Sequence, residues 1–129
     1  MIRWPLSFAE AADRLSILQI KRERIRDPRK LANVEAELLQ AEPLLLDCIP
    51  QTTEFQSLFG RLKELNGRLW DIEEKIRQHE RAGKFGPEFV VLARSVYRTN
   101  DDRYRLKREI DRLLGSPIQE EKSYSDVEY

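Results

Sequence analysis

The sequence predicts an all-α protein: an antiparallel bundle of three to four long helices with an extended C-terminal tail. Apolar residues recur at steps of three and four through four long stretches, which is the spacing of one helix face. Glycine, proline and capping residues separate these stretches, at the places where helices end and begin. We therefore expect one helical domain over residues 1–115 and an extended or disordered acidic tail over residues 116–129.

The first predicted helix begins after Ser7. Ser7 and Glu10 have capping-box spacing, in which each side chain bonds the free backbone N–H of the other. Asp27 and Pro28 are typical of an N-cap followed by proline at the first helical position, so the first helix should end near Arg26. The apolar face of this helix comprises Phe8, Ala11, Ala12, Leu15, Leu18 and Ile25.

The second predicted helix runs from Pro28 toward Cys48. Pro43 should kink or break it, because proline lacks an N–H and clashes with the preceding turn. We expect Cys48, the only cysteine, to be buried as a small hydrophobic residue. The apolar residues form a seam of the kind found in coiled coils, which comprises Leu31, Val34, Leu38, Ala41, Leu45 and Cys48.

The third predicted helix begins near Thr53, which has capping-box spacing to Gln56, and ends at Gly83. Its seam comprises Leu58, Leu62, Leu65, Leu69, Ile72 and Ile76. The fourth helix follows Gly86-Pro87. No glycine or proline interrupts it before Gly115, which favours one helix, although residues 99–102 could cap a second one.

Charge is balanced overall but divided into blocks along the chain. Charged residues make up 36% of the sequence and the net charge is zero. Residues 1–30 carry 8 basic and 4 acidic side chains, whereas residues 31–60 carry 5 acidic and no basic ones. This pattern indicates internal charge pairing or complementary docking. It argues against a nucleic-acid binder, which presents a basic face.

Several classes of protein lack support in the sequence. No stretch approaches the roughly 18 apolar residues of a membrane span, and residues 1–5 have no apolar core of signal-peptide length, so we expect a cytoplasmic protein. One histidine and one cysteine do not make a zinc cluster, and no glycine-rich phosphate loop follows a strand. We expect neither a metal nor another cofactor.

Polar residues beside the apolar seams are the candidates for chemistry. On the third helix, Asn66 requires hydrogen-bond partners if it is buried. Glu73 is the only acid–base candidate, although it can also pair with Arg77 one turn later. Trp70 shares this side of the helix and favours a core or interface position over a ligand platform.

The fourth helix carries further polar residues on one side, and its seam turns polar at Arg103. If the third and fourth helices pack antiparallel, these residues and Asn66 would face a polar pocket between helices. The alternative is a satisfied polar layer that fixes helix register. The predicted anion contacts are Lys21, Arg77, Arg94, Arg103 and Lys107, and the residues that would orient a ligand are Asn66, Tyr97 and Asn100.

Several local strings occur together in an order that resembles a family of bacterial all-helical proteins of this length whose domain has no assigned function. These strings are Leu15–Leu18 with Lys21, Asp27-Pro28, Leu69–Glu73, Leu92–Tyr97 with Asn100, and Glu120–Tyr124. The resemblance implies a bacterial protein encoded near sugar-polymer and glycosyltransferase genes. It also draws attention to Glu121, Lys122 and Tyr124, because a recurrent tail motif would dock on the bundle or on a partner.

A weaker likeness is to all-helical chorismate mutases, through Arg14, Lys21 and Arg24 with Asp27. The chain departs from that family at Lys30, where a glutamate is usual. Helical nucleotide pyrophosphatases need glutamate clusters for magnesium, and the spacing of the glutamates at 35, 37, 73 and 74 does not fit well.

Two functions follow from these patterns. The first is a non-enzymatic helical accessory protein that forms a homo-oligomer or binds a partner protein, and the family resemblance implies a link to bacterial surface-polysaccharide biosynthesis. The alternative is an enzyme or binding module for a phosphorylated or carboxylated small molecule, such as a sugar nucleotide. The sequence leaves open whether the chain is an enzyme.

Overall fold

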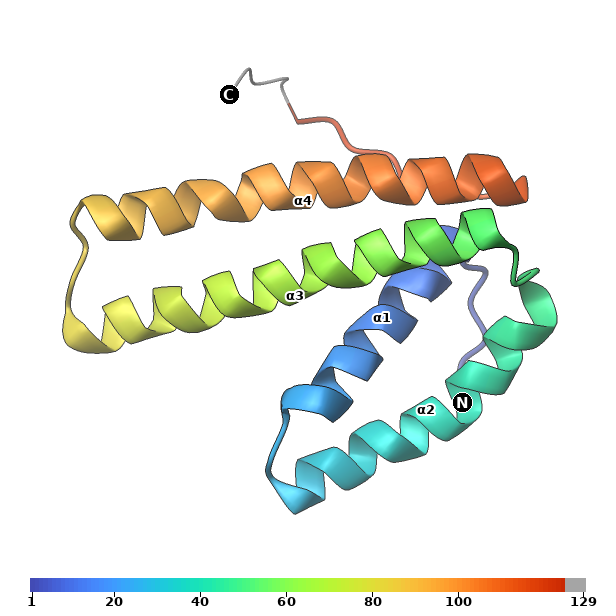
Figure 1. Ribbon diagram of the computed structural model, residues 1–129, viewed down its shortest axis with the longest axis horizontal. Coiled ribbons are helices and arrows are strands. Elements are labelled where there is room, and N and C mark those ends of the chain that lie inside the picture. The colour runs from blue at the N-terminus through green and yellow to red at the C-terminus, as the bar shows by residue number, and fades with distance from the viewer. Residues whose placement is uncertain (125–129) are drawn as a thin grey trace.

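The computed structural model describes residues 1–124 and contains four α-helices (Figure 1). They are α1 (Phe8–Arg24), α2 (Pro28–Cys48), α3 (Thr53–Ala82) and α4 (Pro87–Leu114). The predicted all-helical bundle is confirmed. None of the helices in this part of the chain combines the length and the apolar character that crossing a bilayer requires.

The helix ends follow the caps that the sequence contains. Ser7 Oγ accepts the backbone N–H of Glu10 at 3.0 Å, and Asp27 Oδ1 accepts two N–H groups at the start of α2. Gly83 ends α3 at a φ of 65°, a left-handed conformation that residues other than glycine adopt at a steric cost.

Some boundary predictions were wrong. The N-cap of α3 is Thr52, whose Oγ1 accepts the N–H of Phe55 at 3.1 Å, so the cap lies one residue before the predicted position. The first helix ends at Arg24 because Ile25 already has extended backbone. Pro43 does not break α2, which continues through it to Cys48. Cys48 is exposed, and the next residue, Ile49, is buried in the core in its place.

The long helices α3 and α4 form an antiparallel hairpin. The helix α1 crosses this hairpin at its open end, where α3 begins and α4 ends (Figure 1). The main core lies at the crossing and comprises Ala9, Ala12, Ile49, Phe55, Leu62, Leu106 and Ile110. The two alanines present no large side chain, so the backbone of α1 can approach α3 and α4 closely. The prediction of one uninterrupted fourth helix is confirmed.

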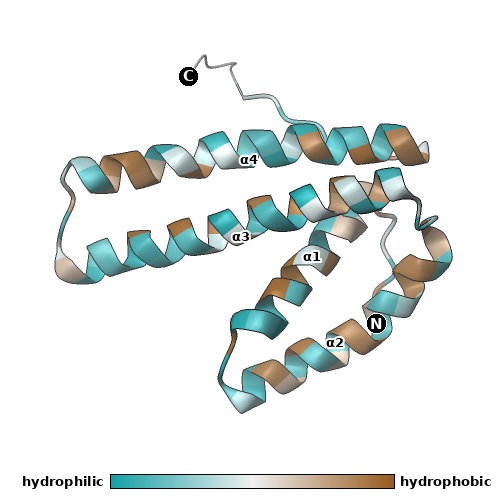
Figure 2. Ribbon diagram, in the orientation of Figure 1, coloured by the Kyte–Doolittle hydropathy of each residue, from teal (hydrophilic) through white to brown (hydrophobic). Residues whose placement is uncertain are grey.

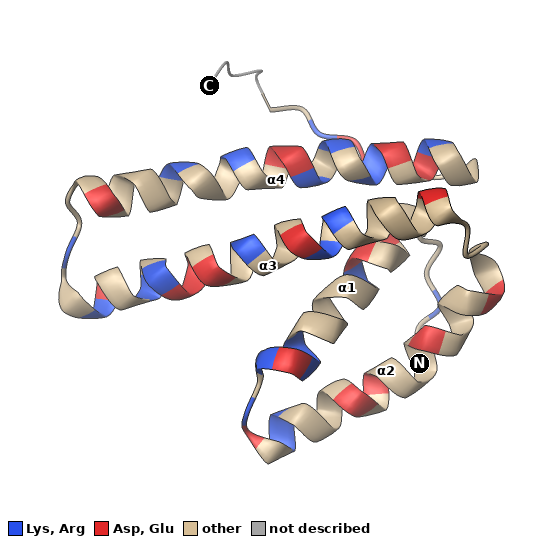
Figure 3. Cartoon of the chain, in the orientation of Figure 1, with Lys and Arg blue, Asp and Glu red and all other residues tan. Residues whose placement is uncertain are grey.

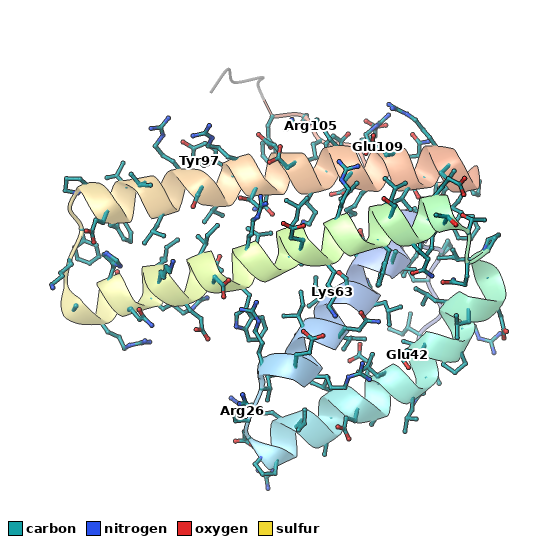
Figure 4. The ribbon with its side chains drawn as sticks, viewed as in Figure 1. Arg26, Glu42, Lys63, Tyr97, Arg105 and Glu109 are labelled. Carbon is teal, nitrogen blue, oxygen red and sulfur yellow. The ribbon has the colours of Figure 1, made fainter. Side chains whose placement is uncertain are left out.

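The helix α2 returns antiparallel along α1 and packs on it through a smaller cluster of Leu18, Val34 and Leu38. It reaches the main core only at its C-terminal end, through Leu45 and Ile49. Figure 4 shows Lys63 between α3 and α1, and Glu42 between α2 and α1. These side chains pair with Glu23 and Arg22 of α1, respectively. One side of α2 is therefore covered by α1, and the other side has no helix against it.

Candidate functional site: a polar cluster and an adjoining groove

Polar side chains from α1, α3 and α4 meet where these three helices cross. We call this set the polar cluster: Glu10, Asp13, Ser16, Asn66, Arg103 and Lys107, with Glu120 of the tail. Asp13, Ser16, Asn66 and Lys107 are all buried. Their burial is costly unless each polar group finds a partner, so the contacts decide what the cluster does.

Asn66 on α3 is the centre of the cluster. Its amide nitrogen donates to Asp13 Oδ1 and to Ser16 Oγ, both at 2.7 Å. Its amide oxygen accepts from Arg103 Nη1 at 3.0 Å. The amide thus uses both donors and its acceptor across three helices. The prediction that a buried Asn66 requires partners is confirmed.

Lys107 on α4 lies among three carboxylates. Its Nζ is 2.7 Å from Glu10 Oε2, 2.8 Å from Glu120 Oε2 and 3.7 Å from Asp13 Oδ2. Two of the three ammonium donors form hydrogen bonds to Glu10 and Glu120, and Asp13 adds a longer ion pair. Lys107 is therefore neutralised inside the protein. It does not present the free cation that the prediction of an anion contact requires.

Lys107 and Glu10 shift each other's pKa values in the directions that favour their charged forms. Burial alone would lower the pKa of Lys107, but the hydrogen bonds to Glu10 and Glu120 and the charge of Asp13 outweigh burial and raise it above its ordinary value. Burial alone would raise the pKa of Glu10, but the hydrogen bond and charge of Lys107 lower it overall, helped by nearby arginines. Both groups are therefore held in their charged forms.

Arg103 differs from Lys107 because it is held by amides instead of carboxylates. Its Nη1 donates to Asn66 Oδ1, and its Nη2 donates to Asn100 Oδ1 at 2.9 Å. No carboxylate of residues 1–124 forms an ion pair with this half-buried guanidinium. Two of its five N–H donors are used in these bonds. Its charge is therefore fixed in position but not directly paired.

A groove adjoins the cluster between α1, α3 and α4. Its volume is about 370 Å³, which lies within the range of about 300–1,000 Å³ typical of small-molecule sites. It runs along α3 from Asn66, past Leu69 and Trp70, to Glu73. Its lining comprises Ile17, Ile20, Asn66, Leu69, Trp70, Glu73, Glu74, Arg77 and Arg103. The walls are mostly apolar, and Arg103 lies at the same end as Asn66.

Glu73 and Arg77 lie at the outer end of this groove. Arg77 Nη1 donates to both the carboxylate and the backbone oxygen of Glu73, one turn earlier on the same helix. The i, i+4 pairing that the sequence allowed is therefore present. The acid–base role of Glu73 stays a prediction. Its carboxylate already has a cationic partner.

The other predicted contacts do not join the cluster. Lys21 is half-buried on α1 and lines no part of the groove, and Arg94 is exposed on α4. Tyr97 is about half exposed on the N-terminal half of α4 (Figure 4). The structure brings together Asn66, Asn100, Arg103 and Lys107, with Glu73 and Arg77 nearby. Arg94 and Tyr97 lie apart from the cluster because the polar contacts between α4 and α1 are made by Lys107 and Asp111, in the C-terminal half of α4.

The tail returns along α4. Besides the Lys107 contact of Glu120, Arg108 Nη1 lies 3.3 Å from Glu121 Oε1, and Lys122 Nζ is 5.1 Å from the ring centroid of Tyr104. Residues 120–122 therefore contact α4, and binding of a partner by the tail stays a prediction. Tyr124 is exposed, and the predicted tail beyond it lies outside the described residues.

Sequence reasoning missed Ser16, Glu10 and Glu120 as members of the cluster, and it missed Asp111 beside them. Asp111 Oδ1 accepts the backbone N–H of Ala9 at 2.9 Å, so a carboxylate of α4 caps the N-terminus of α1. A helix N-terminus favours an anion there. The signal in the sequence was the run of small residues on α1, which predicts a close helix approach.

No protein-family model, curated protein or solved structure matches this chain. The family resemblance therefore stays a prediction. Among residues 1–124, no group of three or more histidine, cysteine, aspartate or glutamate side chains is placed to hold a metal ion.

Proposed function

We propose that this chain is a non-enzymatic interaction protein that binds a helix of a partner protein on the outer face of α2. The observation that carries the proposal is a second apolar stripe on α2, most of it on the side away from α1; Leu46, at its end, also lines a pocket with Leu15 and Gln19 of α1. The members of the stripe follow steps of four, three, four and three and are all exposed. We call this the outer stripe: Ala32, Ala36, Leu39, Pro43 and Leu46.

The outer stripe is not needed for the packing of α2 within the fold. The inner face of α2 already packs on α1 through Val34 and Leu38. Leu39 is 78% exposed and Leu46 is 61% exposed, and hydrophobic residues recur along α2 more than along α3 (Figure 2). A contiguous exposed apolar stripe at this spacing is typical of a surface that receives an amphipathic helix.

Charge on the flanks of the outer stripe specifies the kind of partner. In heptad geometry Glu35 and Glu42 lie on one flank and Asp47 on the other. Basic residues occur only at the start of α2 (Figure 3). Glu42 lies between α2 and α1 and pairs with Arg22, so the exposed acidic charge on the flanks is that of Glu35 and Asp47. The complementary partner is a helix with a leucine or isoleucine stripe flanked by lysine and arginine.

A second copy of α2 is a poorer partner. Antiparallel pairing would bring the glutamate flanks of the two copies together, and parallel pairing would place Glu42 opposite Asp47 of the other copy. Like charges at these positions disfavour association. The proposal therefore commits to a basic partner helix instead of a homodimer through this face.

The hydrogen bonds of the polar cluster support a structural role for it, in keeping with a non-enzymatic protein. Every buried side-chain nitrogen and oxygen within the described residues has a hydrogen-bond partner. Such a layer can specify helix pairing. On the family resemblance, we further propose that the partner belongs to bacterial surface-polysaccharide biosynthesis.

The test uses two synthetic peptides with the same leucine stripe, one flanked by lysine and the other by glutamate. Fluorescence anisotropy should show that the full chain binds the lysine peptide, with an affinity that falls as salt rises. Leu39→Glu combined with Leu46→Glu should weaken binding by more than about tenfold, because both side chains would lie in the contact.

The matched control is Val91→Glu, on α4, where the side chain is 65% exposed and distant in sequence from α2. It should bind the lysine peptide as the parent chain does. Equal binding of both peptides, or no effect of the double substitution, would contradict the proposal. Light scattering provides the second arm: a dimer that the double substitution dissociates would assign the outer stripe to self-association and overturn the basic-helix partner.

A further inference from the structure

We propose that the groove beside the polar cluster binds a small monocarboxylate with an aromatic or other apolar body. This site is separate from the outer stripe, which lies mostly on the side of α2 that faces away from α1. The inference rests on the juxtaposition of one unpaired guanidinium, Arg103, with walls formed by Ile17, Leu69 and Trp70.

The guanidinium of Arg103 is the charged group of the proposed site. Within residues 1–124, Arg103 has no carboxylate partner, although Glu10 and Asp13 belong to the same cluster. Glu10 is engaged by Lys107 at 2.7 Å, and Asp13 Oδ1 accepts from Asn66 at 2.7 Å. The fold therefore supplies carboxylates to Lys107 and amides to Arg103. A guanidinium held in this way retains donors that match a carboxylate.

Arg103 is held in a fixed position. Its hydrogen bonds to Asn66 and Asn100 fix the guanidinium plane between α3 and α4, so little side-chain entropy remains to be lost when an anion binds. Arg103 also lines the groove. A ligand carboxylate that reaches it would lie at the Asn66 end, beside the apolar walls of the groove.

The apolar walls of the groove fit the body of the proposed ligand. Ile17 and Ile20 of α1 face Leu69 and Trp70 of α3 across the groove. From Asn66 to Glu73 the helix advances seven residues, or about 10 Å at 1.5 Å per residue. This length suits a single ring with a short acidic side chain. The indole of Trp70 offers a flat apolar surface for such a ring.

The charges along the groove decide which anions it favours. At the outer end the Glu73–Arg77 pair is internally neutralised, and Glu74 is exposed. A polyanion such as a nucleoside diphosphate would need several free cations, and the groove offers one. The site therefore favours a monocarboxylate over the sugar nucleotide that the sequence left open.

The test uses 3-phenylpropionate and its neutral amide as probes, with the full chain carrying Trp4→Phe. This substitution is exposed at the N-terminus and leaves Trp70 as the only indole. In nitrogen–proton NMR spectra, 3-phenylpropionate should shift the Trp70 indole N–H signal in a saturable manner. The amide should bind at least about tenfold more weakly, because it cannot form the charge-assisted contact with Arg103.

Arg103→Gln is the decisive variant and Arg94→Gln is its matched control, since Arg94 is exposed on the same helix. Arg103→Gln should abolish the preference for the acid over the amide, and Arg94→Gln should retain it. If Arg103→Gln fails to fold, Arg103→Lys is used and should reduce the preference.

Three results would overturn the proposal: no saturable shift of the Trp70 signal at millimolar acid, equal binding of acid and amide, or an unchanged preference in the Arg103 variant. None of these results bears on peptide binding at the outer stripe, so the two proposals fail independently.

Discussion

Lys107 of α4 and Glu10 of α1 form an ion pair at 2.7 Å, although 97 residues separate them in the chain. The side chain of Lys107 is 9% exposed, so solvent screens the pair little. The same ammonium binds Glu120 at 2.8 Å. One cation therefore joins the first helix, the last helix and the tail.

Replacement of this cation should be strongly destabilising. Lys107→Met removes the charge while retaining similar volume, and it leaves three carboxylates near one another. We expect a loss of about 3–5 kcal/mol in the free energy of unfolding, as for a broken buried pair. Urea denaturation measures the loss. Lys63→Met, which removes the more exposed pair with Glu23, should cost under about 1 kcal/mol. Equal losses would contradict a special role for Lys107.

The same pair should make stability depend on pH at both extremes. The pKa of Glu10 is lowered in the folded state, so its stabilisation is present above its unfolded value of about 4.3 and is lost as pH falls through the lower folded value. The pKa of Lys107 is raised, so its stabilisation is present below about 10.4 and is lost as pH rises through the higher folded value.

Urea denaturation of the parent and of Glu10→Gln at several pH values tests the acid side of this dependence. The stability difference between the two proteins should be largest at neutral pH and should shrink toward acid. A difference that grows toward acid would contradict the lowered pKa of Glu10.

Asn66→Asp should convert a satisfied centre into a repulsive one. The new carboxylate would face Asp13, which now accepts from the Asn66 amide at 2.7 Å. We expect a loss of about 1–3 kcal/mol at neutral pH. Acidification should recover part of it, because a protonated carboxyl can donate. Asn100→Asp is the control, since Asn100 accepts from Arg103 and a carboxylate there should be neutral or stabilising. A loss in the control as large as that in Asn66→Asp would refute this account.

Asp111→Ala should weaken the N-terminus of α1. Asp111 is buried and accepts the N–H of Ala9 at 2.9 Å, so its removal leaves that donor without a partner. We expect a cost of about 1–2 kcal/mol in thermal or urea unfolding, as for loss of a helix cap. Asp102→Ala, which removes an exposed pair within α4, should change stability little.

Pro43→Ala should stabilise the protein. Pro43 lies inside α2, where proline cannot donate the helical hydrogen bond to the residue four positions earlier. We expect a gain of about 1–3 kcal/mol, measured as a higher midpoint of urea denaturation. Pro28→Ala at the first helical position should give no comparable gain, because that N–H has no helical partner in any case. A loss of stability in Pro43→Ala would contradict this expectation.

Most helix ends are local properties, and the sequence predicted them together with a bundle of three to four helices. Ser7, Asp27 and Gly83 act on backbone groups within a few residues, so their effects can be read from adjacent positions. The apolar period likewise identified the packed faces that contain Leu38 and Leu62. The alternative that Pro43 breaks the second helix was wrong, because packing of α2 on α1 holds the helix together against a local penalty.

The site was only partly predictable. Asn66 and Arg103 stood out because each interrupts or borders an apolar seam, and such a position requires a partner. The sequence could not say that Lys107 would be neutralised by Glu10 and Glu120 while Arg103 would receive only amides.

The sequence by itself determined three to four amphipathic helices, their approximate ends and the polar interruption among them, since these follow from spacing and from caps within a turn or two. The tertiary structure alone decided that α1 crosses the end of the α3–α4 hairpin, which brings Asp13 to Asn66 and Glu10 to Lys107. It also decided which face of α2 is left uncovered. The physical reason is that charge pairing and burial depend on distances between helices, and helical periodicity carries no information about those distances.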